Sequence, residues 1–373
     1  MKKDNFIGYR PTWAEVNLGN LSFNFQQIKQ ILPAKVKVMV CVKADAYGHG
    51  LIPVASRLAK NGVDYLSVAS IDEGIELREA GIKLPILVLG IILEKDIWPL
   101  LKYGLSQTVC TEDLARSLSF AGEKSGHKIH IHVKVDTGMG RLGVIHKDAV
   151  SFIKKINKFK GINIEGIFTH LSLADINRDF TLHQIKLFND LFAKLKKALI
   201  SIPLIHAANS LGVTNYKESH FNMVRPGLVI YGLYPEELSN IELKPVLSLK
   251  TRVVYLKRVP AGYGISYGYT YVTKKEATIV NLPIGYGDGY PRNLSNLAAV
   301  LINGRRFKIS GRVCMDQIMV DVGDTKVTVG DEVVLIGSQG KNKINTEELA
   351  ALSATIPYEI VCGLSSRIPR IYT

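Results

Sequence analysis

The chain has 373 residues and a net charge of +14, and its composition excludes two classes of protein. Hydrophobic residues make up 47% and charged residues 21%, so the chain can bury a sizeable core and does not resemble a disordered protein. The longest uncharged apolar stretch, residues 84–93, is shorter than the roughly 20 residues that cross a bilayer. We expect two or three domains.

The N-terminus and the cysteines favour a cytoplasmic protein. Residues 1–5 carry charges, but no apolar run follows them, so they do not resemble a signal peptide. The four cysteines are widely spaced and form no Cys-x-x-Cys pair, so neither a zinc knuckle nor a disulfide framework is expected. The lysines are spread along the chain and no arginine-rich run occurs. This favours a solvated basic surface, with neither nucleic acid nor membrane as a partner.

The first two thirds of the chain alternate between apolar runs and helical patterns. A helix is expected from about residue 18 to 32, and the clearest one covers about residues 178–199. Eight apolar runs read as strands, namely 36–42, 65–68, 86–89, 106–109, 129–135, 162–168, 203–207 and 228–231. Alternating strands and helices are typical of a parallel sheet, and eight strands can close it. We therefore predict an α/β fold, a (β/α)8 TIM-type barrel over residues 13–244.

The pattern changes near residues 244–245. Strand signals then follow one another with little helix between them, at 246–256, 277–281, 299–302, 306–310, 317–321 and 332–336. Glycine and proline separate these runs. This predicts a C-terminal, mainly β-strand domain over residues 245–373. Residues 1–12 form a leader that we expect to pack with that domain.

A lysine follows the first predicted barrel strand. Catalytic side chains of such barrels lie at the carboxyl ends of the strands, and the run 36–42 ends in Lys43. Burial there would lower the pKa of the lysine and suit a covalent bond to a carbonyl group. Lysines just past a strand end are more often surface residues, so position alone does not decide the role of Lys43.

Residues 43–50, Lys-Ala-Asp-Ala-Tyr-Gly-His-Gly, resemble the cofactor-attachment motif of the alanine racemases, a family of fold-type III pyridoxal-phosphate enzymes. Further blocks typical of this family are 136–141, 206–210, 225–227, 266–268, 285–290, 311–316 and 357–359. The resemblance covers residues 12–372, and the order and spacing of the blocks make it specific. It implies a cytoplasmic homodimer that racemises alanine and supplies D-alanine for peptidoglycan.

The resemblance also implies a two-base mechanism. Pyridoxal 5'-phosphate would be bound to Lys43, and its conjugated system would make the Cα–H of the substrate acidic. Lys43 would then serve the D face, and Tyr267 of the other subunit would serve the L face. A tyrosine has an ordinary pKa of about 10, so nearby cations are needed to make it a base. Without the resemblance, Tyr267 would read as a turn residue in a glycine-rich loop.

Roles for the remaining site residues follow from the same resemblance. Arg225 would face the pyridine nitrogen, where many pyridoxal enzymes have a carboxylate, and would keep that nitrogen unprotonated. The phosphate would be held by Tyr47, Ser210, Tyr358 and the backbone N–H groups of Gly227 and Leu228. Asn209 and His170 would line the cofactor. Arg141 would contact the phenolic oxygen and the substrate carboxylate, which would also meet the backbone of Met315 from the partner subunit.

Lys134 occupies a position that is often carbamylated in this family. An ammonium group near Arg141 would be repelled, whereas a carbamate is anionic and can pair with it. Because carbamylation requires the neutral amine, the resemblance implies a buried site for Lys134.

Other functions are compatible with single motifs. Residues 138–143 match the dinucleotide pattern GxGxxG, but Glu165, about 20 positions on, lies inside a strand run. His130, His132 and Lys134 alternate on one strand and, with His170 and His206, suggest a metal-dependent barrel hydrolase as the alternative. The blocks indicate no metal site. A pyridoxal-dependent decarboxylase is disfavoured by Arg225. A racemase of serine or of broader specificity stays open, because a small apolar pocket excludes an added hydroxyl only weakly.

Overall fold

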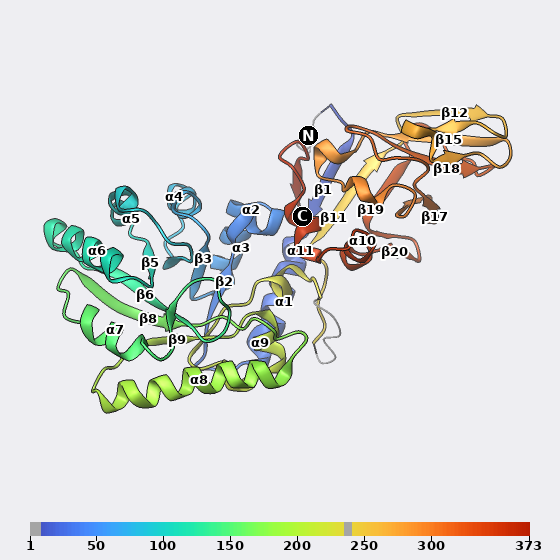
Figure 1. Ribbon diagram of the computed structural model, residues 1–373. Helices are drawn as coiled ribbons and strands as arrows, with labels where there is room; N and C mark the ends of the chain where they lie inside the picture. Colours follow the sequence, from blue (N-terminus) through green and yellow to red (C-terminus); the bar gives the residue numbers. More distant parts are fainter. Residues whose placement is uncertain (1–8, 235–240) are drawn as a thin grey trace.

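The computed structural model describes residues 9–234 and 241–373, and two bodies are evident in it (Figure 1). The first is a closed ring of eight parallel strands surrounded by helices, as the alternating pattern predicted. The ring comprises β2 (Lys37–Cys41), β3 (Tyr65–Val68), β4 (Ile86–Val88), β5 (Ser106–Val109), β6 (Ile129–Asp136), β8 (Ile162–Phe168), β9 (Leu204–His206) and β10 (Met223–Val224). Pairing of β5 with β6 and of β10 with β2 closes it. None of the helices in these residues is long and apolar enough to cross a membrane.

The eighth strand is not the one that the sequence predicted. Residues 228–231 form a short 3-10 helix, η3 (Leu228–Tyr231), and β10 at Met223–Val224 completes the ring instead. An apolar run of four residues fits a buried strand and a buried helical turn equally well, so periodicity could not separate the two. The correction places Arg225 directly after the last strand, at the carboxyl-end mouth of the barrel.

The helices that surround the barrel strands are α1 (Leu18–Ile31), α2 (Lys43–Gly48), α3 (Leu51–Lys60), α4 (Ile71–Glu79), α5 (Ile97–Lys102), α6 (Glu112–Ser125), α7 (Ala149–Ile156), α8 (Arg178–Lys197) and α9 (Ser210–Asn215). The side chains of Asn17, Ser70, Thr111 and Asn177 accept hydrogen bonds from first-turn N–H groups of α1, α4, α6 and α8. Such caps are worth about 1 kcal/mol each.

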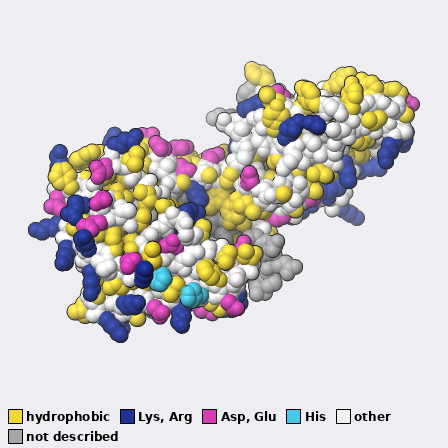
Figure 2. Space-filling model, viewed as in Figure 1, with side chains coloured by type: hydrophobic (Ala, Val, Ile, Leu, Met, Phe, Trp, Pro, Cys, Tyr) yellow, Lys and Arg dark blue, Asp and Glu magenta, His cyan; other side chains and the backbone are white. Residues whose placement is uncertain are grey.

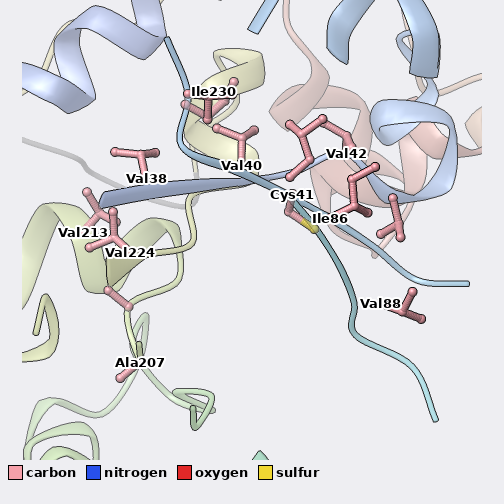
Figure 3. Packing of buried hydrophobic residues seen from close by; sticks show 14 of the residues in the cluster. Val38, Val40, Cys41, Val42, Ile86, Val88, Ala207, Val213, Val224 and Ile230 are labelled. Carbon is pink, nitrogen blue, oxygen red and sulfur yellow. The ribbon is translucent and has the colours of Figure 1, made fainter. Parts of the chain in front are cut away.

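Strand alternation divides the barrel core into two layers. Val38 and Val40 of β2 are fully buried in the large apolar cluster formed mainly by the strands and surrounding helices (Figure 3). Met39, between them, belongs to a separate small cluster with Leu87 of β4 and Met223 of β10. Because side chains alternate along a strand, this second cluster lies on the inner face of the ring.

The C-terminal body is built mainly from strands, as expected, and has a core of its own. Its strands are β11 (Leu247–Arg252), β12 (Tyr255–Val259), β13 (Gly264–Ile265), β14 (Tyr271–Val272), β15 (Ala277–Leu282), β16 (Ala299–Ile302), β17 (Arg305–Lys308), β18 (Ile318–Gly323), β19 (Glu332–Gln339), β20 (Asn342–Ile344) and β21 (Arg370–Tyr372), with helices α10 (Thr346–Leu352) and α11 (Pro357–Cys362). The predicted strand 246–256 is in fact β11 and the start of β12, which belong to different sheets.

Strand β1 (Thr12–Val16) belongs to the C-terminal body, although the sequence boundary assigned residues 13–16 to the barrel. It pairs antiparallel with β11 and parallel with β21. Just before it, Arg10 forms two hydrogen bonds with the buried carboxylate of Asp288, at 2.5 and 2.6 Å. The apolar periodicity of residues 18–32 starts only after β1, so the strand had no signal of its own. Residues 1–8 of the leader lie outside the described part of the chain.

Candidate active site

A cavity of about 580 Å³ opens at the carboxyl ends of the barrel strands. Its lining includes all ten residues that the sequence nominated to bind the cofactor within one chain: Lys43, Tyr47, Arg141, His170, Asn209, Ser210, Arg225, Gly227, Leu228 and Tyr358. Lys134 lines it as well. Residues from seven separate stretches of sequence therefore converge on one space.

Lys43 begins an unusual turn at the edge of this cavity. The four residues that follow it, Ala44–Tyr47, have φ values between 51° and 55°, which is a turn of left-handed helix. This conformation costs roughly 1–2 kcal/mol per non-glycine residue, so tertiary contacts must hold it. One such contact is Glu73 of α4, whose carboxylate accepts hydrogen bonds from the N–H of Ala44 at 2.6 Å and of Ala69 at 2.7 Å.

The C-terminal body closes over the far end of the same turn. A Cβ atom at Gly48 would lie 2.1 Å from the carbonyl oxygen of Val361 in α11, so only glycine allows this approach. Arg370 of β21 donates a hydrogen bond to the carbonyl oxygen of Gly48 at 3.1 Å. Two bodies of the fold thus meet at the turn that positions Lys43.

Hydroxyl groups and backbone N–H groups gather around Gly227. A Cβ atom there would lie 2.6 Å from Tyr47 Oη, so the missing side chain leaves a cradle open. Ser210 Oγ accepts from the N–H of Gly227 at 3.1 Å, and the rings of Tyr47 and Tyr358 lie 5.7 Å apart. The N–H of Leu228 begins η3, where helical N–H groups have no partner inside the helix. This donor set suits a phosphate group.

Burial keeps the two tyrosines of this cradle in their donor form. It raises the pKa of Tyr358 to about 12 and the pKa of Tyr47 well above its ordinary value. Both phenols therefore stay protonated at neutral pH and can donate to an anion.

Arg225 lies buried on the floor of the cavity. Its Nη1 donates to His206 Nδ1 at 2.7 Å, its Nη2 donates to the carbonyl oxygen of Thr169 at 2.7 Å, and its Cζ lies 5.1 Å from the centre of the Phe168 ring. Among the described residues no carboxylate forms an ion pair with it. Burial lowers its pKa to about 10, so the guanidinium still carries its charge at neutral pH.

Lys134 of β6 lies on the same aromatic ring. Its Nζ is 5.4 Å from the centre of Phe168 and donates to the carbonyl oxygen of Val135 at 3.0 Å. Burial, and then the charge of Arg225, lower the pKa of Lys134 to about 7. A large fraction of this amine is thus neutral near neutral pH.

Arg141 is carried by a loop that folds back on its own strand. The carboxylate of Asp136 accepts hydrogen bonds from the N–H groups of Gly138, Met139 and Gly140 at 2.8–3.2 Å. These amides are therefore occupied, and the GxGxxG pattern of residues 138–143 shapes a turn here. A pyrophosphate has no free N–H cradle at this loop.

His170 and Asn209 complete the lining. Burial, followed by the charge of Arg225, lowers the pKa of His170 well below its ordinary value, so the ring is neutral. Asn209 caps α9, and its Oδ1 accepts from the N–H of Gly212 at 2.9 Å. Both side chains are held at the mouth by the ends of their strands.

Tyr267 and Met315 lie elsewhere in the chain. They line a separate hollow on the C-terminal body, together with neighbours such as Tyr269 and Asp316. Tyr267 is 70% exposed and Met315 is 53% exposed. Figure 2 shows hydrophobic side chains at the outer end of the C-terminal body, and lysines and arginines on both the barrel and the C-terminal body. The chain therefore does not bring Tyr267 to the cavity of its own Lys43.

Sequence reasoning missed several residues that line the cavity, among them Cys41, Ser67, Phe168 and Ile356. Phe168 matters most, because Arg225, Lys134 and His206 all pack against its ring; the His206 ring is stacked on it at 4.9 Å. A signal was present in the sequence. Phe168 is the last residue of a predicted barrel strand, where chemistry is expected.

The buried histidines that suggested a metal site already have hydrogen-bond partners in the protein. Nδ1 of His132 lies 2.8 Å from Nε2 of His206, the other nitrogen of His132 faces Glu165 at 3.2 Å, and the other nitrogen of His206 faces Arg225. Within residues 9–234 and 241–373 no three His, Cys, Asp or Glu side chains are grouped to hold a metal ion. The metal-hydrolase alternative therefore finds no free ligands at these rings.

Comparison with known proteins decides between the remaining families. Residues 16–235 match the family model "Alanine racemase, N-terminal domain", and residues 246–372 match "Alanine racemase, C-terminal domain". The chain belongs to the alanine racemase family. The two matches correspond to the barrel and the C-terminal body, and racemisation of alanine is accordingly its activity.

Individual alanine racemases are similar over nearly the full length. The enzyme of Halothermothrix orenii is 52% identical, covering 97% of each chain. A solved alanine racemase of Clostridium difficile 630 in complex with cycloserine superposes with a TM-score of 0.90 at 39% identity, covering 97% of this chain and 96% of that one. The Bacillus anthracis enzyme with bound L-Ala-P gives a TM-score of 0.92 at 37% identity, with coverage of 98% and 96%.

Proposed function

We propose that the chain interconverts L-alanine and D-alanine with pyridoxal 5'-phosphate held in the barrel cavity and with Lys43 and Tyr267 as the two bases. One observation carries the proposal. The ten residues that were predicted to bind the cofactor line one cavity, while Tyr267 and Met315 line a separate exposed hollow. Within a single chain, the cavity that contains Lys43 therefore lacks Tyr267, and Tyr267 lies outside that cavity.

The cradle around Gly227 would bind the phosphate, and Lys43 would hold the aldehyde carbon of the cofactor. When bound, the cofactor withdraws electrons from the substrate and makes its Cα–H acidic. Lys43 Nζ then removes or returns the proton on the D face of Cα. Oη of Tyr267, from the partner subunit, does the same on the L face. The two groups must exchange roles in the two directions of the reaction, because the reaction is reversible.

Arg225 would face the ring nitrogen of the cofactor. A guanidinium can only donate hydrogen bonds, so it would leave that nitrogen without a proton and would weaken the electron withdrawal that the cofactor supplies. Arg225 would thereby favour return of the proton to Cα of alanine over protonation at another atom. Arg141, at the rim, would bind the phenolic oxygen of the cofactor and the carboxylate of the substrate, which would also meet the backbone of the partner's Met315.

The proposal includes the assembly and the setting. Two chains would form a homodimer in the cytoplasm, each completing the site of the other, and would supply D-alanine for peptidoglycan. The four cysteines are free thiols, as a reducing compartment requires. Similar alanine racemases have been solved in complex with cycloserine and with bound L-Ala-P, and both ligands are compatible with a site for a small amino acid.

Exchange of the α-proton with deuterated water tests the two bases separately. We expect Lys43→Ala to lose racemisation in both directions by at least about a thousandfold, within the range of acid–base catalysis by one group. Tyr267→Phe should slow exchange from L-alanine far more than from D-alanine. The exposed Lys60→Ala is the matched control and should keep full activity. Normal turnover by Lys43→Ala refutes the assignment, and equal losses of exchange in Tyr267→Phe favour a single base.

A panel of amino acids tests the substrate. We expect alanine to be converted fastest and serine more slowly, since a small apolar pocket discriminates only about 10- to 200-fold against such a change. Chiral chromatography after incubation with added pyridoxal phosphate measures both. Faster conversion of serine than of alanine would overturn the choice of substrate.

A further inference from the structure

A line of polar side chains crosses the interior of the barrel beneath Arg225. Arg225 Nη1 donates to His206 Nδ1 at 2.7 Å, and His206 Nε2 lies 2.8 Å from His132 Nδ1. His132 Nε2 lies 3.2 Å from Glu165 Oε2. Both imidazoles are fully buried, whereas the side chain of Glu165 is 19% exposed. The line therefore joins the floor of the cavity to a carboxylate deeper in the barrel.

The guanidinium determines where every proton in this line is placed. Arginine only donates, so Nδ1 of His206 must accept and its proton must be on Nε2. That N–H can donate only if Nδ1 of His132 accepts, which leaves the proton of His132 on Nε2, facing Glu165. A second proton on either imidazole would place two N–H donors opposite each other, so both rings must be neutral. Burial lowers the pKa of both histidines, in agreement with this assignment.

The backbone of β8 is shaped around the same line. Ile164 pairs with Ile131 and Gly166 pairs with His132, so Glu165 is an extra residue, a β-bulge. Bulges change the direction of a side chain and are common beside active sites. A Cβ atom at Gly166 would lie 2.3 Å from His132 Nδ1, so the imidazole occupies the space that a side chain would need.

The carboxylate at the end of the line is held ionised. Glu165 accepts hydrogen bonds from Tyr65 Oη at 2.9 Å and Ser106 Oγ at 3.1 Å, and His130 Nδ1 lies 3.9 Å from it. Burial alone would raise the pKa of Glu165, but the hydrogen bonds that it accepts from His132 and Tyr65 outweigh burial and lower the pKa. The line therefore has one negative end and one positive end at neutral pH.

We infer that Glu165 is the remote counter-charge of Arg225, and that His132 and His206 are positioning residues that connect the two charges. A buried guanidinium without a compensating charge is unfavourable. A carboxylate beside it would compensate the charge but would also bring an acceptor into the cavity. Two neutral imidazoles let Glu165 compensate Arg225 from a distance, so the cavity side of Arg225 stays a pure donor.

The protonation pattern can be tested apart from catalysis. The role of Arg225 against the cofactor rests on the proposed function, whereas the tautomers of the histidines do not. In the full-length enzyme labelled with ¹⁵N-histidine, with and without added pyridoxal phosphate, we expect His132 and His206 to be single neutral Nε2–H tautomers throughout about pH 6–9. A proton on Nδ1 of either ring, or a charged ring, overturns the inference.

Three variants test the counter-charge. Glu165→Gln keeps the shape but removes the charge, so we expect kcat to fall about tenfold with KM within about twofold, and the His206 signals to shift although His206 does not touch residue 165. Tyr65→Phe removes a hydrogen bond to Glu165 but no charge, and Glu123→Gln removes an exposed charge of α6. Both controls should stay within about twofold of wild type.

Two results would contradict the inference. Unchanged kcat and unchanged His206 signals in Glu165→Gln would show that the charge does not act on Arg225. An equal loss in Tyr65→Phe would show that packing around the carboxylate matters, and not its charge. Thermal unfolding of each variant measures whether it folds, and the tautomers of the wild-type enzyme decide the question even where a variant does not.

Discussion

Cationic side chains are crowded around one aromatic ring at the mouth of the barrel. Arg225 and Lys134 both lie within 5.4 Å of the centre of Phe168, and Arg141 lines the same cavity. Two fixed guanidinium charges make a third cation unfavourable, so the group that can lose its proton does so. Burial, together with the charges of the two guanidinium groups, lowers the pKa of Lys134 to about 7 and makes it the reactive member of the set.

Carbamylation of Lys134 is the expected outcome. Near pH 7 about half of the amine is neutral, and the neutral fraction increases as the pH rises through the pKa, so the carbamate should be more abundant at about pH 8 than at about pH 6. A ¹³C NMR signal from enzyme in ¹³C-bicarbonate measures it. The signal should vanish in Lys134→Gln and remain in a variant of the exposed Lys128. A spectrum without any carbamate signal contradicts the prediction.

The left-handed turn after β2 is a strained element at the edge of the site. Four successive residues with positive φ present Lys43 at the strand end, and contacts from Glu73 and from the C-terminal body keep the turn in place. Strain of this kind persists only where the surrounding structure determines it, and it is concentrated at functional sites. The strained turn therefore lowers the stability of the protein, and the contacts that maintain it hold Lys43 in one position.

Glycine at the first position of the turn should relieve part of this strain. Ala44 is exposed and has φ 52°, so Ala44→Gly is expected to raise the free energy of unfolding by about 1 kcal/mol. In the right-handed helix α10, Ala351→Gly at an exposed position should instead lower it by about 0.5–1 kcal/mol. Urea unfolding measures both. The interpretation fails if the two substitutions change stability in the same direction.

Sequence patterns predicted the elements that have a clear period and missed those that depend on distant partners. Seven of the barrel strands and the long helix α8 were located, since apolar residues recur in them at the spacing of a strand or helix. The eighth strand was predicted at η3 and not at β10, because a two-residue strand is too short to show a period. Strand β1 was missed because no periodic pattern marks it. The motif resemblance predicted the residues that line the cavity. It could not predict the position of the Glu165 side chain, because that position depends on a β-bulge that is visible only in the pairing of the strands.

At the scale of the whole molecule, the proposed dimer would build each active site from residues of both chains. Lys43 lies in the barrel cavity, and Tyr267 is exposed on a hollow of the C-terminal body. An exposed tyrosine cluster rimmed by polar groups is typical of a surface that another chain covers. Activity should then depend on association of the chains, because dissociation would separate the two bases.

Mixing two inactive variants tests the sharing of sites. After exchange of subunits between Lys43→Ala and Tyr267→Phe, half of the dimers are mixed and each mixed dimer has one intact site, so about one quarter of the wild-type activity should return. A racemisation assay before and after exchange measures the recovery. Lys43→Ala mixed with itself is the control. No recovery despite proven exchange would mean that each site is contained in one chain.

The position of β1 between β11 and β21 also limits how the gene product can be divided. The amino end of the chain supplies an inner strand to a sheet whose other members come from the carboxyl end, and Val16 is hydrogen-bonded to the last residue, Thr373. A fragment that starts after the barrel would leave β21 without its neighbour and would expose an open edge of β11, which invites aggregation. During synthesis, this sheet can be completed only after residues 370–372 have left the ribosome. The two bodies are therefore separate in shape but cannot mature as independent polypeptides.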